Sequence, residues 1–386
     1  MTSPFHFAPF TSDEDLSALR QEVRDFVATF DPDWRGRDLA MGWFGFDPEF
    51  SRAVAERGWI GMTWPKSYGG GERSAMARYA VIEELMAAGA PLGAHWIAER
   101  QSGPLLLRLG SEAQRAQFLP PITRGEISFC IGLSEPDAGS DLASLRARAT
   151  PAEGGWRLNG RKIWTTNAHR CQFMIGLFRS GGSPETSKHQ GLSQYLIDLT
   201  SSGIDIRPIR DLSGETHFNE VVFDDVFVPA DMLVGREGEG WAQANAELAY
   251  ERSGPDRFLS VFALLPATVD ALRGQGEPDR LGARRIGEGV AQLAVLRQMS
   301  LSIQGMLDAG QTPAQEAALV KQLGTTYEQQ IPDLVREVLD GSPAITGADR
   351  LAETLAYTTM FAPSFSLRGG TREILRGIIA RGLGLR

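Results

Sequence analysis

The sequence predicts an α+β protein in which helical parts flank a β-rich middle part. Apolar residues recur at the spacing of an amphipathic helix from about residue 13 to residue 124. Between residues 127 and 234 they give way to short β-rich runs, separated by clusters of glycine, asparagine, aspartate and proline. Helical spacing returns from residue 241 onward. The predicted domains are a helical domain at 1–126, a β domain at 127–234 and a second helical domain at 235–386.

Loops interrupt the first helical part. One apolar stripe at helical spacing is formed by Leu16, Leu19, Val23, Phe26, Val27 and Phe30. The stretch "GWIGMTWPKSYGGG" (58–71) predicts a loop, because proline and several glycines interrupt a helix. A second stripe at residues 76–86 predicts another helix. The stretch "SEAQRAQFLPPI" (111–122) predicts a short helix that stops at its proline pair.

Six runs rich in β-branched and aromatic residues predict the strands of a small antiparallel β domain. In chain order they are "ISFCIGL" (127–133), "GWRLNGRKIWTT" (155–166), "CQFMIGLF" (171–178), "SQYLIDL" (193–199), "GIDIRPI" (203–209) and "FNEVVFDDVFVP" (218–229). In the last part of the chain, glycines and prolines predict breaks between helices near 274–278, 310–313 and 341–347.

Composition excludes several classes of protein. The chain has 386 residues, 42% of them hydrophobic and 23% charged, which suits two or three globular domains. A net charge of −9 argues against a general binder of nucleic acid or anionic membranes. Two cysteines, Cys130 and Cys171, make no disulfide framework, and no spacing of cysteine and histidine predicts a metal site. Because we find neither a signal peptide nor a membrane-length apolar run, we expect a cytoplasmic protein.

Two stretches of the β domain offer groups for a planar ligand. The stretch "CIGLSEPDAGSDLASL" (130–145) joins a strand to a turn of small residues, with hydroxyls at Ser134 and Ser140. The stretch "LNGRKIWTTNA" (158–168) adds Trp164 and two more hydroxyls. Taken alone, the first stretch is more often an ordinary loop closure and Trp164 an ordinary core residue.

The stretch "RGGTREILRG" (368–377) predicts a helix N-terminus with close backbone access. Gly369 and Gly370 leave space for a ligand, and Thr371 can cap the following helix, whose free N–H groups suit a diphosphate or a polarised carbonyl. Arginines recur every four residues here, either as a solvated basic stripe or as partners for ligand phosphates: Arg368, Arg372 and Arg376.

Taken in order, these motifs resemble those of the acyl-CoA dehydrogenase family over nearly the whole chain. The stretches "GWIGMTWPKSYGG" (58–70) and "GPLLLRLGSEAQRAQFLPPITRGEISFC" (103–130) are similar to the same family. The resemblance implies an N-terminal helical domain, a middle antiparallel β-barrel domain and a C-terminal four-helix bundle. It also implies FAD as cofactor, an acyl-CoA as substrate, an electron-transfer flavoprotein as electron acceptor, and a role in acyl-CoA catabolism.

The resemblance also implies roles for individual residues. The expected contacts of FAD are Ile131, Leu133, Ser134, Gly139, Ser140, Trp164, Thr165, Thr166, Thr371 and Glu373. The expected contacts of the substrate are Ser140, Arg252 and Gly370.

The position of the catalytic base departs from the family's commonest pattern. Many members carry a carboxylate directly before the Gly-Thr of the C-terminal turn, where it takes the α-proton while hydride passes to flavin N5. Here that residue is Gly369, which can donate only its N–H to the thioester oxygen. In other members a Glu-Arg pair on the first long helix of the last domain takes over, and "ELAYERSG" (247–254) matches it with Glu251 and Arg252. We therefore predict Glu251 as the base, although an isolated helical glutamate is usually a solvated charge.

Two stretches replace motifs that reach the FAD of a neighbouring subunit in the family. They are "EPDRLGARRIGEGVAQL" (277–293) and "VLDGSPAITGADRL" (338–351). The chain is therefore expected to form either a homo-oligomer, dimer or tetramer, or a heterotetramer with a related subunit. Family members with the base in this alternative position often accept branched or bulky acyl groups, so the resemblance implies such a substrate. An oxygenase-like relative without need of a base, and an FAD-poor partner subunit, stay open as other functions.

Overall fold

The computed structural model describes residues 5–10, 14–30, 33–183, 187–275, 280–339 and 349–385. These residues divide into two compact units. One consists of Met1–Gly45, Arg73–Pro91 and Ala249–Arg386, and the other of Phe46–Glu72 and Leu92–Leu248. The predicted N-terminal domain contributes segments to both units, and the division into three domains stays a prediction. None of the described helices is long and apolar enough to cross a membrane.

A single sheet forms the centre of the second unit. Its strands are β1 (Phe129–Gly132), β2 (Arg148–Ala152), β3 (Gly155–Thr166), β4 (Phe173–Arg179), β5 (Leu192–Asp198), β6 (Ile204–Ile209), β7 (Phe218–Pro229) and β8 (Leu233–Val234). Their order is β6-β7-β3-β2-β4-β5-β8, with β1 beside β4. Neighbours are antiparallel, as predicted, except that β1 and β2 pair with β4 in parallel.

All six predicted strands are present, and the two that were not predicted carry weak signals. Strand β2 has the sequence "RATPA", in which a proline interrupts the β-branched pattern, and β8 is only two residues long. Both are held by pairing with longer neighbours, a contribution that sequence periodicity does not reveal.

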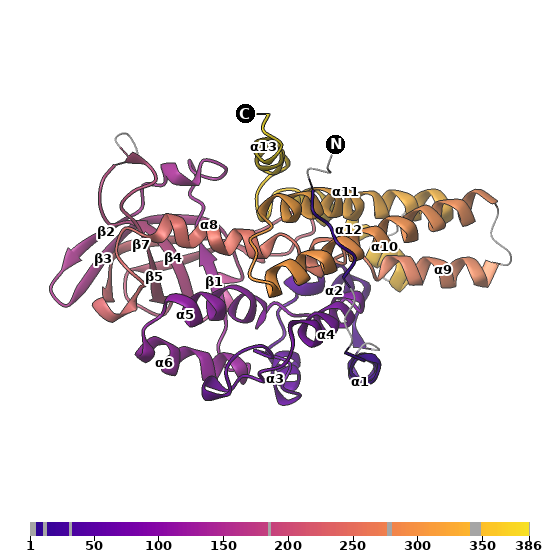
Figure 1. Ribbon diagram of the computed structural model, residues 1–386, viewed down its shortest axis with the longest axis horizontal. Coiled ribbons are helices and arrows are strands. Elements are labelled where there is room, and N and C mark those ends of the chain that lie inside the picture. Colours follow the sequence, from indigo (N-terminus) through magenta and orange to yellow (C-terminus); the bar gives the residue numbers. More distant parts are fainter. Residues whose placement is uncertain are drawn as a thin grey trace. The chain divides into compact units, whose positions relative to one another are not determined.

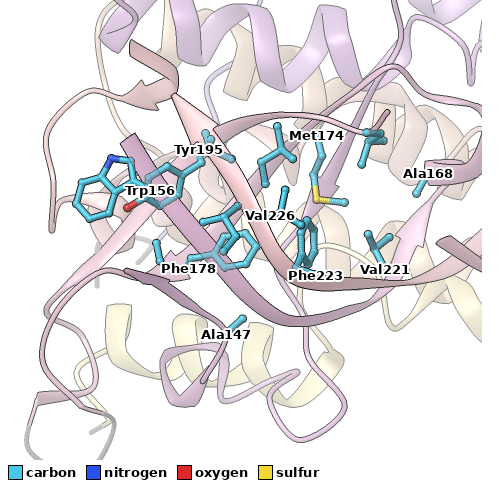
Figure 2. Close-up of a cluster of buried hydrophobic side chains, with 14 of the residues drawn as sticks. Ala147, Trp156, Ala168, Met174, Phe178, Tyr195, Val221, Phe223 and Val226 are labelled. Atoms are coloured by element: carbon cyan, nitrogen blue, oxygen red, sulfur yellow. The ribbon is translucent and has the colours of Figure 1, made fainter. Parts of the chain in front are cut away.

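The sheet curls around one apolar core, in agreement with the predicted barrel. The rings of Phe178 on β4 and Phe223 on β7 lie 5.1 Å apart, although β3 and β2 separate these strands in the sheet. Trp156 on β3 and Tyr195 on β5 also meet, at 5.5 Å. Figure 2 shows these side chains turned toward a common interior. Such burial supplies most of the free energy that holds the strands together.

Helices α3 (Pro48–Glu56), α5 (Gly103–Leu109) and α6 (Glu112–Thr123) belong to the same unit. Helix α6 begins as its sequence suggests, since Ser111 and Gln114 form a reciprocal capping box. Its predicted end was wrong, because the helix includes Pro120 and Pro121. Proline's fixed φ suits a helix, and the chain leaves the helix within one turn, where the Thr123 hydroxyl bonds the Pro120 carbonyl at 2.8 Å.

The first unit is helical. Its helices are α1 (Ser17–Val27), α2 (Gly36–Met41), α4 (Ala75–Ala87), α9 (Leu264–Gln275), α10 (Arg280–Asp308), α11 (Ala314–Leu339), α12 (Arg350–Phe365) and α13 (Arg372–Gly382), and the end of α8 (Gly240–Glu251) leads into it. Figure 1 shows α9, α10 and α11 side by side, and α11 packs against α9, α10, α12 and α13. The predicted break at 310–313 is confirmed. The other two predicted breaks fall largely on 276–279 and 340–348, outside the described residues.

A glycine allows α11 to approach the short helix η8 (Pro255–Arg257). A Cβ atom added at Gly324 would lie 2.3 Å from the backbone carbonyl oxygen of Arg257. This approach matters for the site below, because η8 directly follows the segment that carries Arg252.

We expect Gly324→Ala to lower the stability of the protein by about 1–3 kcal/mol, because the new methyl group would overlap a backbone atom. The matched control is Gly287→Ala on α10, where an added Cβ meets nothing within 4 Å. That helical, exposed position should instead gain about 1 kcal/mol. Thermal unfolding of both variants checks the prediction, and equal melting temperatures would contradict it.

Candidate active site

The structure joins the two predicted flavin-binding stretches of the second unit. The carbonyl oxygen of Ser134, after β1, accepts a hydrogen bond of 2.9 Å from the N–H of Ile163 on β3. The ammonium group of Lys162 donates to the carbonyl oxygen of Leu133 at 3.2 Å. The turn at residues 133–138, which we call the flavin-edge turn, is thereby fastened to β3 directly before Trp164.

A buried ion pair lies beneath this turn. Lys162 Nζ and Glu135 Oε1 are 2.9 Å apart, with side-chain exposures of 0% and 9%. The Glu135 carboxylate also accepts the backbone N–H groups of Arg146 and Ala147, at 2.7 and 2.9 Å. Burial lowers the pKa of Lys162, and the negative charge of Glu135 opposes this effect.

Neither member of this pair was among the predicted site residues, although one signal for it is present. Trp156 and Leu158 alternate into the core along β3, and this alternation places Lys162 on the inward side as well. A lysine at such a position requires a buried acceptor, so the sequence predicts that a partner exists but not that the partner is Glu135.

A bulge presents Trp164 to solvent. The register of β3 against β7 shifts between Lys162 and Thr165, and Trp164 has a left-handed φ of 60°. Its side chain is 56% exposed, so the interpretation of Trp164 as a core aromatic is wrong. Thr165 beside it is buried, and its hydroxyl has no hydrogen-bond partner among the described residues.

The remaining predicted flavin contacts of the second unit are accessible. Gly139 and Ser140 are exposed, while Ile131, Leu133, Ser134 and Thr166 are partly exposed. Reciprocal hydrogen bonds between the backbones of Glu135 and Ala138, at 3.0 and 3.1 Å, close the flavin-edge turn. Within the described residues we find no partner for the N–H or the hydroxyl of Ser134. An exposed indole, a buried lone hydroxyl and an unbonded N–H suit a planar cofactor with hydrogen-bonding edges, so the residues present fit FAD.

Other predicted site residues lie in the glycine turn at residues 368–371 of the first unit. Gly369 and Gly370 have φ angles of 64° and 96°, a conformation that side chains with a Cβ rarely adopt. Thr371 caps α13, since its hydroxyl accepts the N–H of Ile374 at 3.5 Å. The N–H of Glu373 itself, together with the Thr371 hydroxyl, lowers the pKa of the exposed Glu373 carboxyl.

Two buried cations hold the carbonyl groups of this turn. Arg252 Nε donates to the Gly369 carbonyl at 3.2 Å, and Lys321 Nζ on α11 donates to the Gly370 carbonyl at 3.1 Å. Arg252 is 7% exposed and Lys321 is fully buried. The structure therefore brings Arg252, Gly369 and Gly370 together, and their roles toward a substrate stay a prediction. Glu251 is the last residue of α8, directly before Arg252, and its side chain lies outside the described part of the structure.

The three arginines of the glycine turn and α13 do not form one stripe. Arg368 is paired with Glu328 at 3.0 Å and stacks over Trp43 and Phe365, with 5.1 and 4.6 Å to the ring centroids. It is therefore a paired and mostly buried charge and not a solvated one. Arg372 donates to the side chain of Gln329. Only Arg376 of the three is exposed.

Comparison with known proteins identifies relatives along the whole chain. Three family models match: "Acyl-CoA dehydrogenase, N-terminal domain" at residues 13–126, "Acyl-CoA dehydrogenase, middle domain" at 130–226 and "Acyl-CoA dehydrogenase, C-terminal domain" at 238–384. The acyl-CoA dehydrogenase IpdE1 of Mycobacterium tuberculosis is 33% identical over 96% of this chain and 98% of its own length. FadE34 of the same organism is 34% identical over 87% of this chain, which spans only 46% of that longer protein.

Two solved structures share the fold over almost their full length. A "Tcur3481-Tcur3483 steroid ACAD" matches with a TM-score of 0.86 and 26% identity, over 96% of this chain and 97% of that one. The "ChsE4-ChsE5 complex from Mycobacterium tuberculosis" matches with a TM-score of 0.83 and 26% identity, over 98% of this chain and 100% of that one.

We expect Thr165→Val to weaken FAD binding while leaving the FAD-free protein as stable or up to about 1 kcal/mol more stable, because a buried hydroxyl without a partner is unfavourable. The matched control is Thr358→Val on α12, which removes another buried hydroxyl without a partner among the described residues. It should change stability in the same direction and leave FAD affinity unchanged. Thermal unfolding and FAD titration measure the two effects, and equal FAD affinity of both variants would count against a flavin contact at Thr165.

Proposed function

Because the chain belongs to the acyl-CoA dehydrogenase family, we propose that it forms the α,β double bond of an acyl-CoA with Glu251 as the base. Family membership makes the chain an FAD-dependent oxidoreductase that acts on acyl-CoA thioesters. The base, the acyl group and the electron acceptor go beyond that membership and are our proposals.

The hydrogen bond from Arg252 to Gly369 carries the proposal for Glu251. It holds the end of α8 against the glycine turn, where the residue before Gly-Thr has no carboxylate of its own. Only a side chain from a neighbouring segment can therefore take the proton at this turn, and Glu251 directly precedes Arg252. A carboxylate enclosed beside an acyl chain loses its water and becomes a stronger base.

The glycine turn supplies the complementary electrostatic element. The N–H of Gly369 would donate to the thioester oxygen, which gains negative charge as the α-proton leaves. Gly370 would contact the substrate, and the start of α13 at Thr371 and Glu373 would contact FAD. When bound, FAD supplies the acceptor for the hydride that leaves the β-carbon.

We further propose a branched or bulky acyl group and an electron-transfer flavoprotein as acceptor. A base from another helix alters the shape of the acyl site, and a similar solved structure is described as a steroid ACAD. The relatives also support an oligomeric enzyme. We propose a homo-oligomer, with pairing to a related subunit as the alternative.

Glu251→Gln should leave a folded, yellow protein whose flavin no longer bleaches with acyl-CoA. General-base catalysis typically contributes about 10²–10⁴-fold, so the rate of bleaching should fall by that factor. Stopped-flow absorbance under anaerobic conditions measures it. The matched control is Glu247→Gln, one turn earlier on α8, which should bleach like the unaltered protein. Full bleaching of the Glu251 variant would overturn the assignment of the base.

A panel of acyl-CoAs of increasing bulk should bleach the flavin of the purified protein, with the bulkier members more effective. Electron-transfer flavoprotein should then restore the oxidised spectrum without oxygen. Product formation that requires oxygen and added reduced flavin would instead identify an oxygenase-like relative. Recovery of the isolated chain without FAD, together with restored FAD binding on adding a related subunit, would identify the heteromeric alternative.

A further inference from the structure

We propose that Lys162 and Glu135 are positioning residues for the flavin, which hold the flavin-edge turn on β3 so that Ser134 and Trp164 keep their relative placement. The inference rests on the proposed function, because it requires FAD beside the flavin-edge turn. Neither residue was predicted as a flavin contact, and both lie inside the protein.

The contacts of the Lys162 ammonium group hold it in one position. An ammonium group has three N–H donors. The Lys162 ammonium donates to Glu135 Oε1 at 2.9 Å and to the Leu133 carbonyl at 3.2 Å, and it lies 5.0 Å from the centre of the Phe178 ring. With the side chain fully buried, these contacts fix the Leu133 carbonyl on the core side of the turn.

Glu135 fastens the rest of the loop to the same point. Its carboxylate oxygens accept the N–H groups of Arg146 and Ala147, which lie 11 and 12 residues further along the chain. The Glu135 carboxylate therefore connects three parts of the chain: the flavin-edge turn, residues 146–147 directly before β2, and strand β3. Loss of either charged group would release two segments at once.

The planar peptide bond between Leu133 and Ser134 links the contact of Lys162 to the direction of the Ser134 N–H. In a planar trans peptide the C=O and the following N–H point in opposite directions. Because the Leu133 carbonyl points at Lys162, the N–H of Ser134 points away from the core. The Ser134 carbonyl accepts a hydrogen bond from the N–H of Ile163, the residue before Trp164. The backbone positions of Ser134 and Trp164 are therefore fixed relative to each other.

A role in stability alone is a weaker explanation for the pair. Buried ion pairs contribute little to stability compared with apolar side chains of the same size, because both charges lose their water. Trp156 and Leu158 already occupy the equivalent inward positions of β3, and a methionine would suit position 162 once the charge of Glu135 is also removed. What an apolar side chain cannot supply is the hydrogen bond to the Leu133 carbonyl.

The test separates positioning from stability with the double variant Lys162→Met/Glu135→Gln. It removes both buried charges. The N–H groups of Arg146 and Ala147 donate to different oxygens of Glu135, and the single oxygen of the new glutamine side chain can still accept one of them. We expect its FAD-free form to melt within a few degrees of the unaltered protein and its FAD dissociation constant to rise roughly tenfold or more. FAD titration by flavin fluorescence and thermal unfolding without FAD are the two measurements. The single variant Lys162→Met, which leaves Glu135 unpaired, should lower both stability and FAD affinity.

Arg161→Met is the matched control. Arg161 is adjacent on β3, but its ion pair with Glu220, at 3.3 Å, is largely exposed, so FAD affinity and stability should stay unchanged. A double variant that binds FAD as tightly as the unaltered protein would overturn the inference and leave the pair a purely structural feature. If the unaltered protein bound no FAD, the proposed function itself would fail instead.

Discussion

The missing side chain at Gly369 is the constraint on which the proposed chemistry depends. Its left-handed φ of 64° and that of the following glycine, 96°, bend the chain so that both carbonyls are held by buried cations. A residue with a Cβ would be strained there by roughly 1–2 kcal/mol. The turn is therefore shaped for backbone contacts, and in the proposed mechanism the proton acceptor comes from another segment. The hydrogen bond of Arg252 to Gly369 supports the segment that ends α8 as its source.

Ion pairs of buried charged residues connect distant segments of the chain in this protein. Glu83 on α4 forms ion pairs with Arg20 of α1, at 2.7 Å, and with Arg297 of α10, at 2.6 Å. Glu328 on α11 holds Arg368 of the glycine turn in the same way. A buried ion pair adds little to the free energy of unfolding compared with apolar packing. Its contribution is to fix the relative orientation of the segments that it joins. An apolar cluster tolerates small rotations, whereas a charged hydrogen bond specifies which atoms must meet.

The predictable parts of the fold were those with a strong local signal. The six longer strands follow from β-branched and aromatic alternation, and the glycine turn follows from "RGGT". The α6 prolines show the limit of a local rule, because the helix continues past a pair that should stop it. Strands β2 and β8 show another limit, since they exist only through their neighbours. The partner of Lys162 also has no local sequence signal, because Glu135 lies 27 residues away in the chain. Side-chain placement at Glu251 stays a prediction.

The bulge at Trp164 shows why a site of this kind resists prediction from propensity alone. A left-handed tryptophan, an exposed indole and a buried hydroxyl without a partner are each unfavourable in the ligand-free chain. Local rules therefore favour a tryptophan inside the barrel. In the proposed function a flat cofactor would cover the indole and bond the hydroxyl, and its binding would offset these unfavourable terms. Under this proposal, Trp164 and Lys162 are two positions where the protein is shaped for its ligand rather than for its own stability.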